Sequence, residues 1–209
     1  MRMFKRLAVA VALTGVFAGG TAGLASAATT TAQPQWGHST VHLTGGTTKV
    51  TTAPGIAAAL LGHGIVPLAT LPGTEGASIP ASGVAVTFAF PVTGGSVNLK
   101  KVTGTISHSG GILFIAPATG KKIGVSGFVI NLKQGVLTGI VNGNPKARVP
   151  LFSLSLAKAK IAAGKHVVCV SGIVVRLTKT AAGALDATFG TTLFTPGLEF
   201  GTASTQIKF

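Results

Sequence analysis

Hydrophobic and polar positions alternate along most of this chain, in short runs separated by Gly, Pro and Asn. Period-two runs rich in Val, Ile and Thr are typical of strands in an all-β domain. The 30 glycines of the sequence provide many tight turns between such runs. The pattern predicts strands at residues 47–52, 84–90, 101–108, 111–116, 122–132, 136–141, 149–160, 165–177 and 202–209.

Two Ala-rich stretches interrupt this alternation and predict short helices. Residues 53–62 and 178–190 each follow a predicted strand and end at Gly, which is the usual helix stop. Asn142-Gly143 predicts a hairpin, because Asn-Gly suits the positive φ angles of a tight hairpin turn. We therefore expect a mainly β fold, an antiparallel β-sandwich-like domain with two short α-helices.

One short motif occurs twice. Val125-Ser126-Gly127-Phe128-Val129 is echoed by Val170-Ser171-Gly172-Ile173-Val174. The repeat is explained either by duplication or by one edge-strand solution used twice. In both cases we interpret it as architectural and not as a ligand-binding code.

The N-terminus has the three parts of a secretion signal. A basic start with Arg2, Lys5 and Arg6 precedes an uncharged apolar run over residues 7–17, and Ala25-Ser26-Ala27 offers the small-x-small pattern of a cleavage site. The apolar run is too short to span a membrane. The sequence thus predicts a secreted, extracellular protein without an integral membrane span after signal removal. The predicted organisation is a signal peptide at 1–27, a flexible leader at 28–45 and a single β-rich domain at 46–209.

Charge is the most unusual property of the composition. The chain has 17 Lys and Arg against 3 Asp and Glu, a formal net charge of +14. Signal removal takes away three basic residues and leaves +11. Such a protein attracts polyanions, and anionic cell-envelope polymers are the expected partners of a wall-associated protein. Nucleic acid is not expected, because the chain has no Tyr and one Trp with which to stack bases. The charge also has a simpler interpretation, which is solubility.

The residues that enzymes use are scarce. After signal removal the carboxylates are Glu75, Asp186 and Glu199, too few for a paired-carboxylate site or a calcium cage. His38 and His42 share a strand face but have no third ligand, so no metal site is predicted. We expect no enzyme activity and no catalytic residue.

His108 is the most interesting histidine. Period-two counting places it on the same side of its strand as Val102 and Ile106, at the end of the strand. A titratable side chain at the rim of an apolar face either serves the mouth of a pocket or is a hydrogen-bonded boundary residue. The sequence leaves both possibilities open.

Residues 90–95, 104–114 and 125–130, with Val175-Arg176-Leu177-Thr178, resemble the HtaA-type domain of secreted and surface-anchored actinobacterial proteins. The resemblance covers about residues 46–209. It implies a β-rich fold with two short helices and, from the family's characterised members, capture of haem at the cell surface.

The haem ligands of that family do not carry over directly. Its haem-binding members hold the iron with a tyrosine, and this chain has none. Either a histidine ligates the iron or the protein binds something else. For haem, His108 is the candidate ligand, and Lys100, Lys101, Lys121 and Lys122 are the candidates for pairing with the propionates. The leading hypothesis is a secreted binding or cell-surface interaction module of the HtaA-like kind, with haem as one candidate ligand. The alternative is a cationic structural protein held on anionic envelope polymers.

Overall fold

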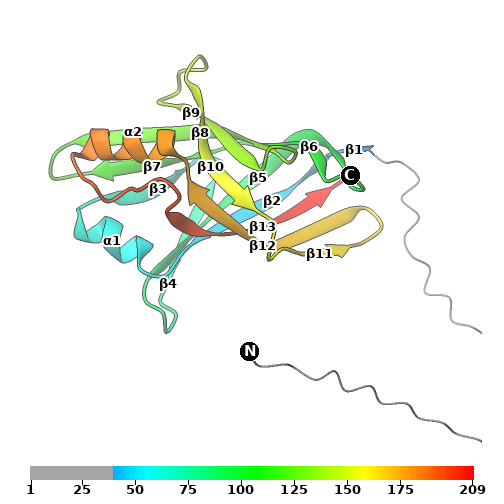
Figure 1. Ribbon diagram of the computed structural model, residues 1–209, viewed down its shortest axis with the longest axis horizontal. Helices are drawn as coiled ribbons and strands as arrows, with labels where there is room; N and C mark the ends of the chain where they lie inside the picture. The colour runs from blue at the N-terminus through cyan, green and yellow to red at the C-terminus, as the bar shows by residue number, and fades with distance from the viewer. Residues whose placement is uncertain (1–39) are drawn as a thin grey trace, which may run out of the picture. The chain divides into compact units, whose positions relative to one another are not determined.

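The computed structural model describes residues 40–209 (Figure 1). The predicted signal peptide, residues 28–39 of the predicted leader, and His38 lie outside the described residues. The described strands are β1 (Thr40–His42), β2 (Gly45–Thr52), β3 (Val66–Thr70), β4 (Thr74–Ser78), β5 (Ala85–Asn98), β6 (Thr103–His108), β7 (Gly111–Ala116), β8 (Lys121–Asn131), β9 (Val136–Val141), β10 (Arg148–Ser155), β11 (Lys160–Ala163), β12 (Val167–Leu177) and β13 (Glu199–Lys208). The helices are α1 (Ile56–Gly62) and α2 (Lys179–Phe189).

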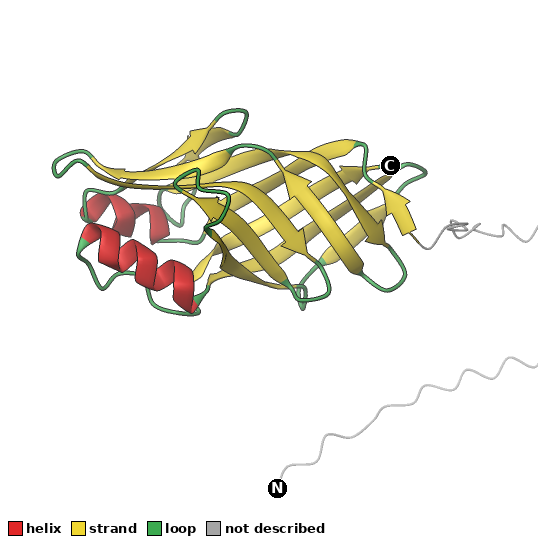
Figure 2. Ribbon diagram, turned by 90° about the horizontal axis from the view of Figure 1, so that it is seen from above, coloured by secondary structure: helices red, strands yellow, loops and turns green. Residues whose placement is uncertain are grey.

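Eight of these strands close into an antiparallel barrel. Around the ring they are β5, β2, β13, β12, β10, β9, β8 and β6, and β6 closes it by pairing with both β8 and β5. The other strands widen the wall: β1 and β4 pair with β5, β11 with β12, β7 with β8, and β3 with β7. Figure 2 shows the slanted strands of the barrel and both helices at one end.

The predicted sandwich is therefore wrong, whereas the mainly β, antiparallel class with two helices is confirmed. A sandwich needs two separate sheets, but β6 joins what would be their edges. Closure pairs every edge of the eight-stranded ring, which removes the unpaired backbone groups that an open sheet leaves.

The repeated Ser-Gly motif marks a β-bulge in each of two barrel strands. The pairing register shifts between Ser126 and Val129 in β8 and between Val170 and Ile173 in β12. Gly127 (φ 57°) and Gly172 (φ 75°) adopt the left-handed conformation at these shifts. Bulges bend long strands and increase their twist, and this bending helps to close a barrel. The architectural interpretation of the repeat fits this finding.

Several element boundaries differ from the predictions. Residues 40–42, inside the predicted leader, already form a strand, because β1 hydrogen-bonds with β5. Strand β7 and both helices lie where the sequence places them. The Asn142-Gly143 turn is also confirmed, with φ of 49° and 71° between β9 and β10. Strands β1, β3, β4 and β11 are additional to the prediction.

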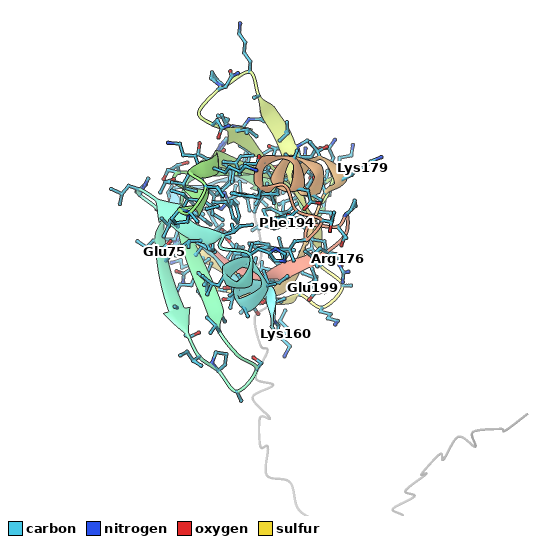
Figure 3. All side chains as sticks on the ribbon, turned by 90° about the vertical axis from the view of Figure 1, so that its left-hand side faces the viewer. Glu75, Lys160, Arg176, Lys179, Phe194 and Glu199 are labelled. Carbon is cyan, nitrogen blue, oxygen red and sulfur yellow. The ribbon has the colours of Figure 1, made fainter. Side chains whose placement is uncertain are left out.

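The two helices cover one end of the barrel (Figures 1 and 2). Thr178 caps the N-terminus of helix α2, and its hydroxyl accepts a hydrogen bond of 3.1 Å from the Ala181 backbone N–H. It buries Ala181, Ala182 and Leu185 beside β8 and β10. Figure 3, viewed onto this end, places Phe194 near the centre, and its side chain is only 3% exposed. Side chains therefore fill this end of the barrel.

Phenylalanines fill the middle of the barrel. The Phe90 and Phe128 rings meet edge to face with centroids 5.0 Å apart, and the Phe152 and Phe200 centroids are 5.3 Å apart. Toward the far end the inner surface changes to a smaller aliphatic cluster that includes Val97, Ile106, Ile130, Val168 and Ile207. The partly buried Phe209 side chain also packs against this cluster.

Candidate functional site

The end of the barrel away from the helices contains a cavity of about 750 Å³, which we call the open-end cavity. Its walls come from the turn between β5 and β6, the turn between β8 and β9, the β10–β11 segment, and strands β12 and β13. Small-molecule sites in proteins usually measure about 300–1,000 Å³. The open-end cavity is therefore large enough for a small organic ligand.

Large apolar side chains stand exposed at this cavity. Val102, Leu156 and Ile161 all line it and are 39%, 39% and 64% exposed. Val102 comes from the turn between β5 and β6, whereas Leu156 and Ile161 come from the β10–β11 segment, so the topology gathers two distant segments here. Exposed apolar groups around a hollow are typical of a surface that a ligand covers.

The backbone at Val102 is strained. Its φ of 50° lies in the left-handed region, which β-branched residues rarely adopt. Such strain persists only where the surroundings enforce it, and it concentrates at ligand-binding and catalytic positions. The turn between β5 and β6 holds Val102 in this conformation at the cavity wall.

A second, smaller cavity of about 40 Å³, the inner cavity, lies deeper in the barrel. His108 lines it, is 5% exposed, and contacts Thr48 through Nε2 and the Thr48 Oγ1 at 2.7 Å. Thr48 Oγ1 is also 2.7 Å from the Thr205 Oγ1. Thr205, Ile130 and Ile173 line both cavities, so this polar chain lies below the floor of the open-end cavity.

Burial keeps His108 neutral. Desolvation lowers its pKa from 6.5 to about 4, and the opposing effect of the Phe128 backbone is smaller. The buried Nδ1 of His108 has no hydrogen-bond partner among the described residues. The Phe128 carbonyl is near enough to affect the pKa without forming a well-aligned bond. At neutral pH His108 is therefore an uncharged, hydrogen-bonded core residue.

The structure does not bring the predicted haem residues into one site. Lys100 and Lys101 lie in the turn between β5 and β6, and β6 runs beside the Asn131 end of β8. Lys121 and Lys122 begin β8 at its other end. Strand β8 advances nine residues from Lys122 to Asn131, so the two lysine pairs lie roughly 30 Å apart at about 3.3 Å per residue.

Haem is the group that the family resemblance implies, and the described residues do not fit an iron-ligated haem. The inner cavity around His108, at about 40 Å³, has space for a water molecule but not for a porphyrin. The open-end cavity has the volume, but no His, Tyr, Cys or Met lines it. A third hollow of about 330 Å³ beside α1 also has no histidine in its lining and contains Glu75, which would repel propionates.

None of the helices in residues 40–209 is long and apolar enough to cross a membrane. Nor do three His, Cys, Asp or Glu side chains gather in that range to hold a metal ion.

The crystal structure of the C-terminal domain of HtaA from Corynebacterium glutamicum superimposes with a TM-score of 0.52 at 15% identity, covering 80% of this chain and 98% of that domain. This chain has an HtaA-like fold. The haem-binding protein HtaB from the same organism is similar at a TM-score of 0.41 and 9% identity, covering 81% of this chain and 96% of HtaB. No family model and no curated protein sequence match the chain.

The HtaA-like fold confirms the resemblance seen in the sequence at the level of the fold. The sequence did not reveal the open-end cavity, because residues that line a hollow and residues that fill a core are equally apolar. One usable signal is the segment 158–165, which mixes three lysines with small and aliphatic residues and leaves Ile161 exposed in strand β11.

Proposed function

We propose that this chain is a non-enzymatic binding module that holds an apolar small molecule in the open-end cavity of its HtaA-like barrel. The single observation that carries the proposal is a cavity of about 750 Å³ with exposed aliphatic side chains at its edge. Covering these side chains would contribute about 25 cal/mol for each Å² of apolar surface removed from water. The geometry offers binding, and no His, Cys, Asp or Glu lines the cavity.

The test uses Nile red, an uncharged dye that fluoresces in apolar surroundings, and the mature protein from Ala28 to Phe209. Strand β11 offers a matched pair of variants, because Ala163 lines the cavity and its neighbour Ala162 does not. Successive side chains of a strand point to opposite faces. Ala163→Trp fills the cavity, whereas Ala162→Trp adds the same ring on the outer face.

We expect saturable binding of one dye per wild-type molecule, about tenfold weaker binding to Ala163→Trp, and unchanged binding to Ala162→Trp. Thermal unfolding of each variant checks that both remain folded. Absence of saturable binding to the wild type, or equal weakening by the two substitutions, would refute the proposal.

Haem is the second candidate ligand. The HtaA-like fold and the volume of the open-end cavity support it, and the lack of an iron ligand in the cavity lining speaks against axial ligation by the protein. A haem titration of the mature protein followed by absorbance decides the matter, with His108→Ala as the comparison. A saturable Soret shift that His108→Ala abolishes would establish ligation by histidine. A shift that the variant retains would exclude it, and no shift would exclude haem.

Adhesion to anionic envelope polymers is the third proposal, and the excess of basic residues supports it. Adhesion of this kind depends on many weak attractions between exposed charges. Salt screens these attractions, with a screening length of about 10 Å at 0.1 M. The proposal therefore predicts that salt alone releases the protein from isolated cell walls. Retention in 1 M salt would contradict it.

A further inference from the structure

The walls of the open-end cavity are aliphatic. The chain has 11 Phe, yet no aromatic residue lines this cavity, and its apolar lining consists of Val, Leu, Ile and Ala. Ligand pockets usually include aromatic side chains, which stack on flat rings. Branched aliphatic walls instead present many small contacts to a flexible hydrocarbon. The lining thus suits an alkyl chain better than a planar aromatic ligand.

The segments that form the mouth of the cavity are basic. Lys133 lines the cavity in the turn between β8 and β9. Further exposed lysines are close in sequence to lining residues: Lys100 and Lys101 in the turn between β5 and β6, Lys158 before Ala159, and Lys165 two residues after Ala163. Clustered cations at the edge of a low-dielectric hollow attract an anion.

None of the three acidic residues lines the open-end cavity. Glu75 lines the hollow beside α1, and Asp186 lies on α2, where its carboxylate accepts hydrogen bonds from Thr191 and Phe194. Glu199 pairs with Arg176 at 2.9 Å, and Figure 3 shows the pair in its view of the helical end. The lining of the cavity therefore has positive charge and no Asp or Glu side chain to neutralise it.

The interior of the cavity excludes a charged group. Thr205 at the floor is 6% exposed, and its hydroxyl is already hydrogen-bonded to Thr48. Below it, His108 is kept neutral by burial. A charged headgroup at this depth would lose its hydration without gaining a counter-ion. A ligand with one charged end is thus oriented with its tail inward and its head at the lysines.

We propose that the ligand class of the open-end cavity is an anionic long-chain amphiphile of the fatty-acid type, with its alkyl chain against the aliphatic walls and its carboxylate at Lys133 and the neighbouring lysines. This inference rests on the proposed function, since it specifies the ligand of the same cavity. It adds a charge requirement that apolar binding alone does not have.

The test compares two fluorescent probes with the same tail, cis-parinaric acid and its uncharged methyl ester. Lys133→Gln removes the charge that lines the cavity. Lys146→Gln is the matched control, because Lys146 is exposed in the turn between β9 and β10 and does not line the cavity. Each probe is titrated into the wild type and both variants in 20 mM and 500 mM salt.

We expect the acid to bind the wild type several-fold more tightly than the ester does. Lys133→Gln should weaken acid binding about two- to fivefold, the range for one exposed charge, and high salt should weaken it further. Lys146→Gln should leave acid binding unchanged, and neither variant nor salt should weaken ester binding.

The outcomes separate this inference from the proposed function. Equal binding of acid and ester, without an effect of Lys133→Gln, would overturn the anionic headgroup and leave apolar binding intact. Failure of both probes together with successful Nile red binding would overturn the long-chain ligand alone. Failure of all three ligands would overturn both proposals.

Discussion

His108 Nε2 and Thr48 Oγ1 lie 2.7 Å apart inside the barrel although 60 residues separate them in sequence. Strand β6 contributes the histidine and β2 the threonine, on opposite sides of β5. Thr205 on β13 extends the contact to a third strand. This polar chain divides the barrel into a phenylalanine-filled region and the hollow end that we propose as the binding site.

The state of His108 predicts a specific loss of stability in acid. Its folded pKa is about 4 and its ordinary value is 6.5, so between these pH values the unfolded chain binds a proton that the folded protein does not. The free energy of unfolding therefore rises with pH across this window. The neutral His108 contributes fully to the free energy of unfolding above about pH 6.5. Up to about 3 kcal/mol of this stability is lost as the pH falls to 4.

The measurement is urea unfolding of the wild type and of His108→Gln at several pH values from 7.5 to 4. The variant should lack this part of the pH dependence, so the wild type's stability advantage should shrink as the pH falls. Parallel pH profiles of the two proteins would show that His108 is not the group responsible.

Thr48→Val should destabilise the barrel by about 1–3 kcal/mol. The substitution keeps the shape of the side chain but leaves His108 Nε2 and the Thr205 hydroxyl buried without this partner. Thr51→Val on the same strand is the matched control, because its bond to Thr87 is only partly buried and water can replace it. Chemical denaturation measures both. A loss at Thr51 as large as that at Thr48 would contradict the buried polar chain.

Two Gly→Ala substitutions should have opposite signs. A Cβ at Gly172 would lie 2.7 Å from the Lys158 carbonyl oxygen, and its φ of 75° is unfavourable for alanine. Gly172→Ala should therefore cost more than about 1 kcal/mol. Gly183→Ala in α2 meets no atom within 4 Å and should stabilise by about 0.5–1 kcal/mol. Melting temperatures give the signs, and a stabilising Gly172→Ala would argue against the bulge geometry.

Much of the secondary structure is predictable from sequence because it depends on local periodicity. Strand β7 (Gly111–Ala116) and helix α2 have clear apolar patterns and the correct stop signals. Strand β4 (Thr74–Ser78) was missed because every residue in it is exposed and none marks an inner face. The short strands β3 and β11 also lack a regular alternation, since Pro67 interrupts β3 and all of β11 is exposed.

Closure and the cavity depend on long-range pairing, which period-two counting does not detect. The barrel closes because Thr105 to Ser107 of β6 pair with β8 while the same strand also pairs with β5. The counting did place His108 and Ile106 correctly on one inner face. It could not show that this face lies in a closed barrel, which is why a residue expected at a strand-end rim is 5% exposed.

The most direct test of the central claim is to locate the bound ligand by amide chemical shifts as 1-decanol, an uncharged alkyl ligand, is titrated into the mature protein. We predict saturable shifts at strand β11, at the turn around Val102 and at the turn around Lys133, with α1 and α2 unchanged. Saturable shifts confined to the helical end, or no saturable shifts at all, would contradict the assignment of the open-end cavity as the binding site.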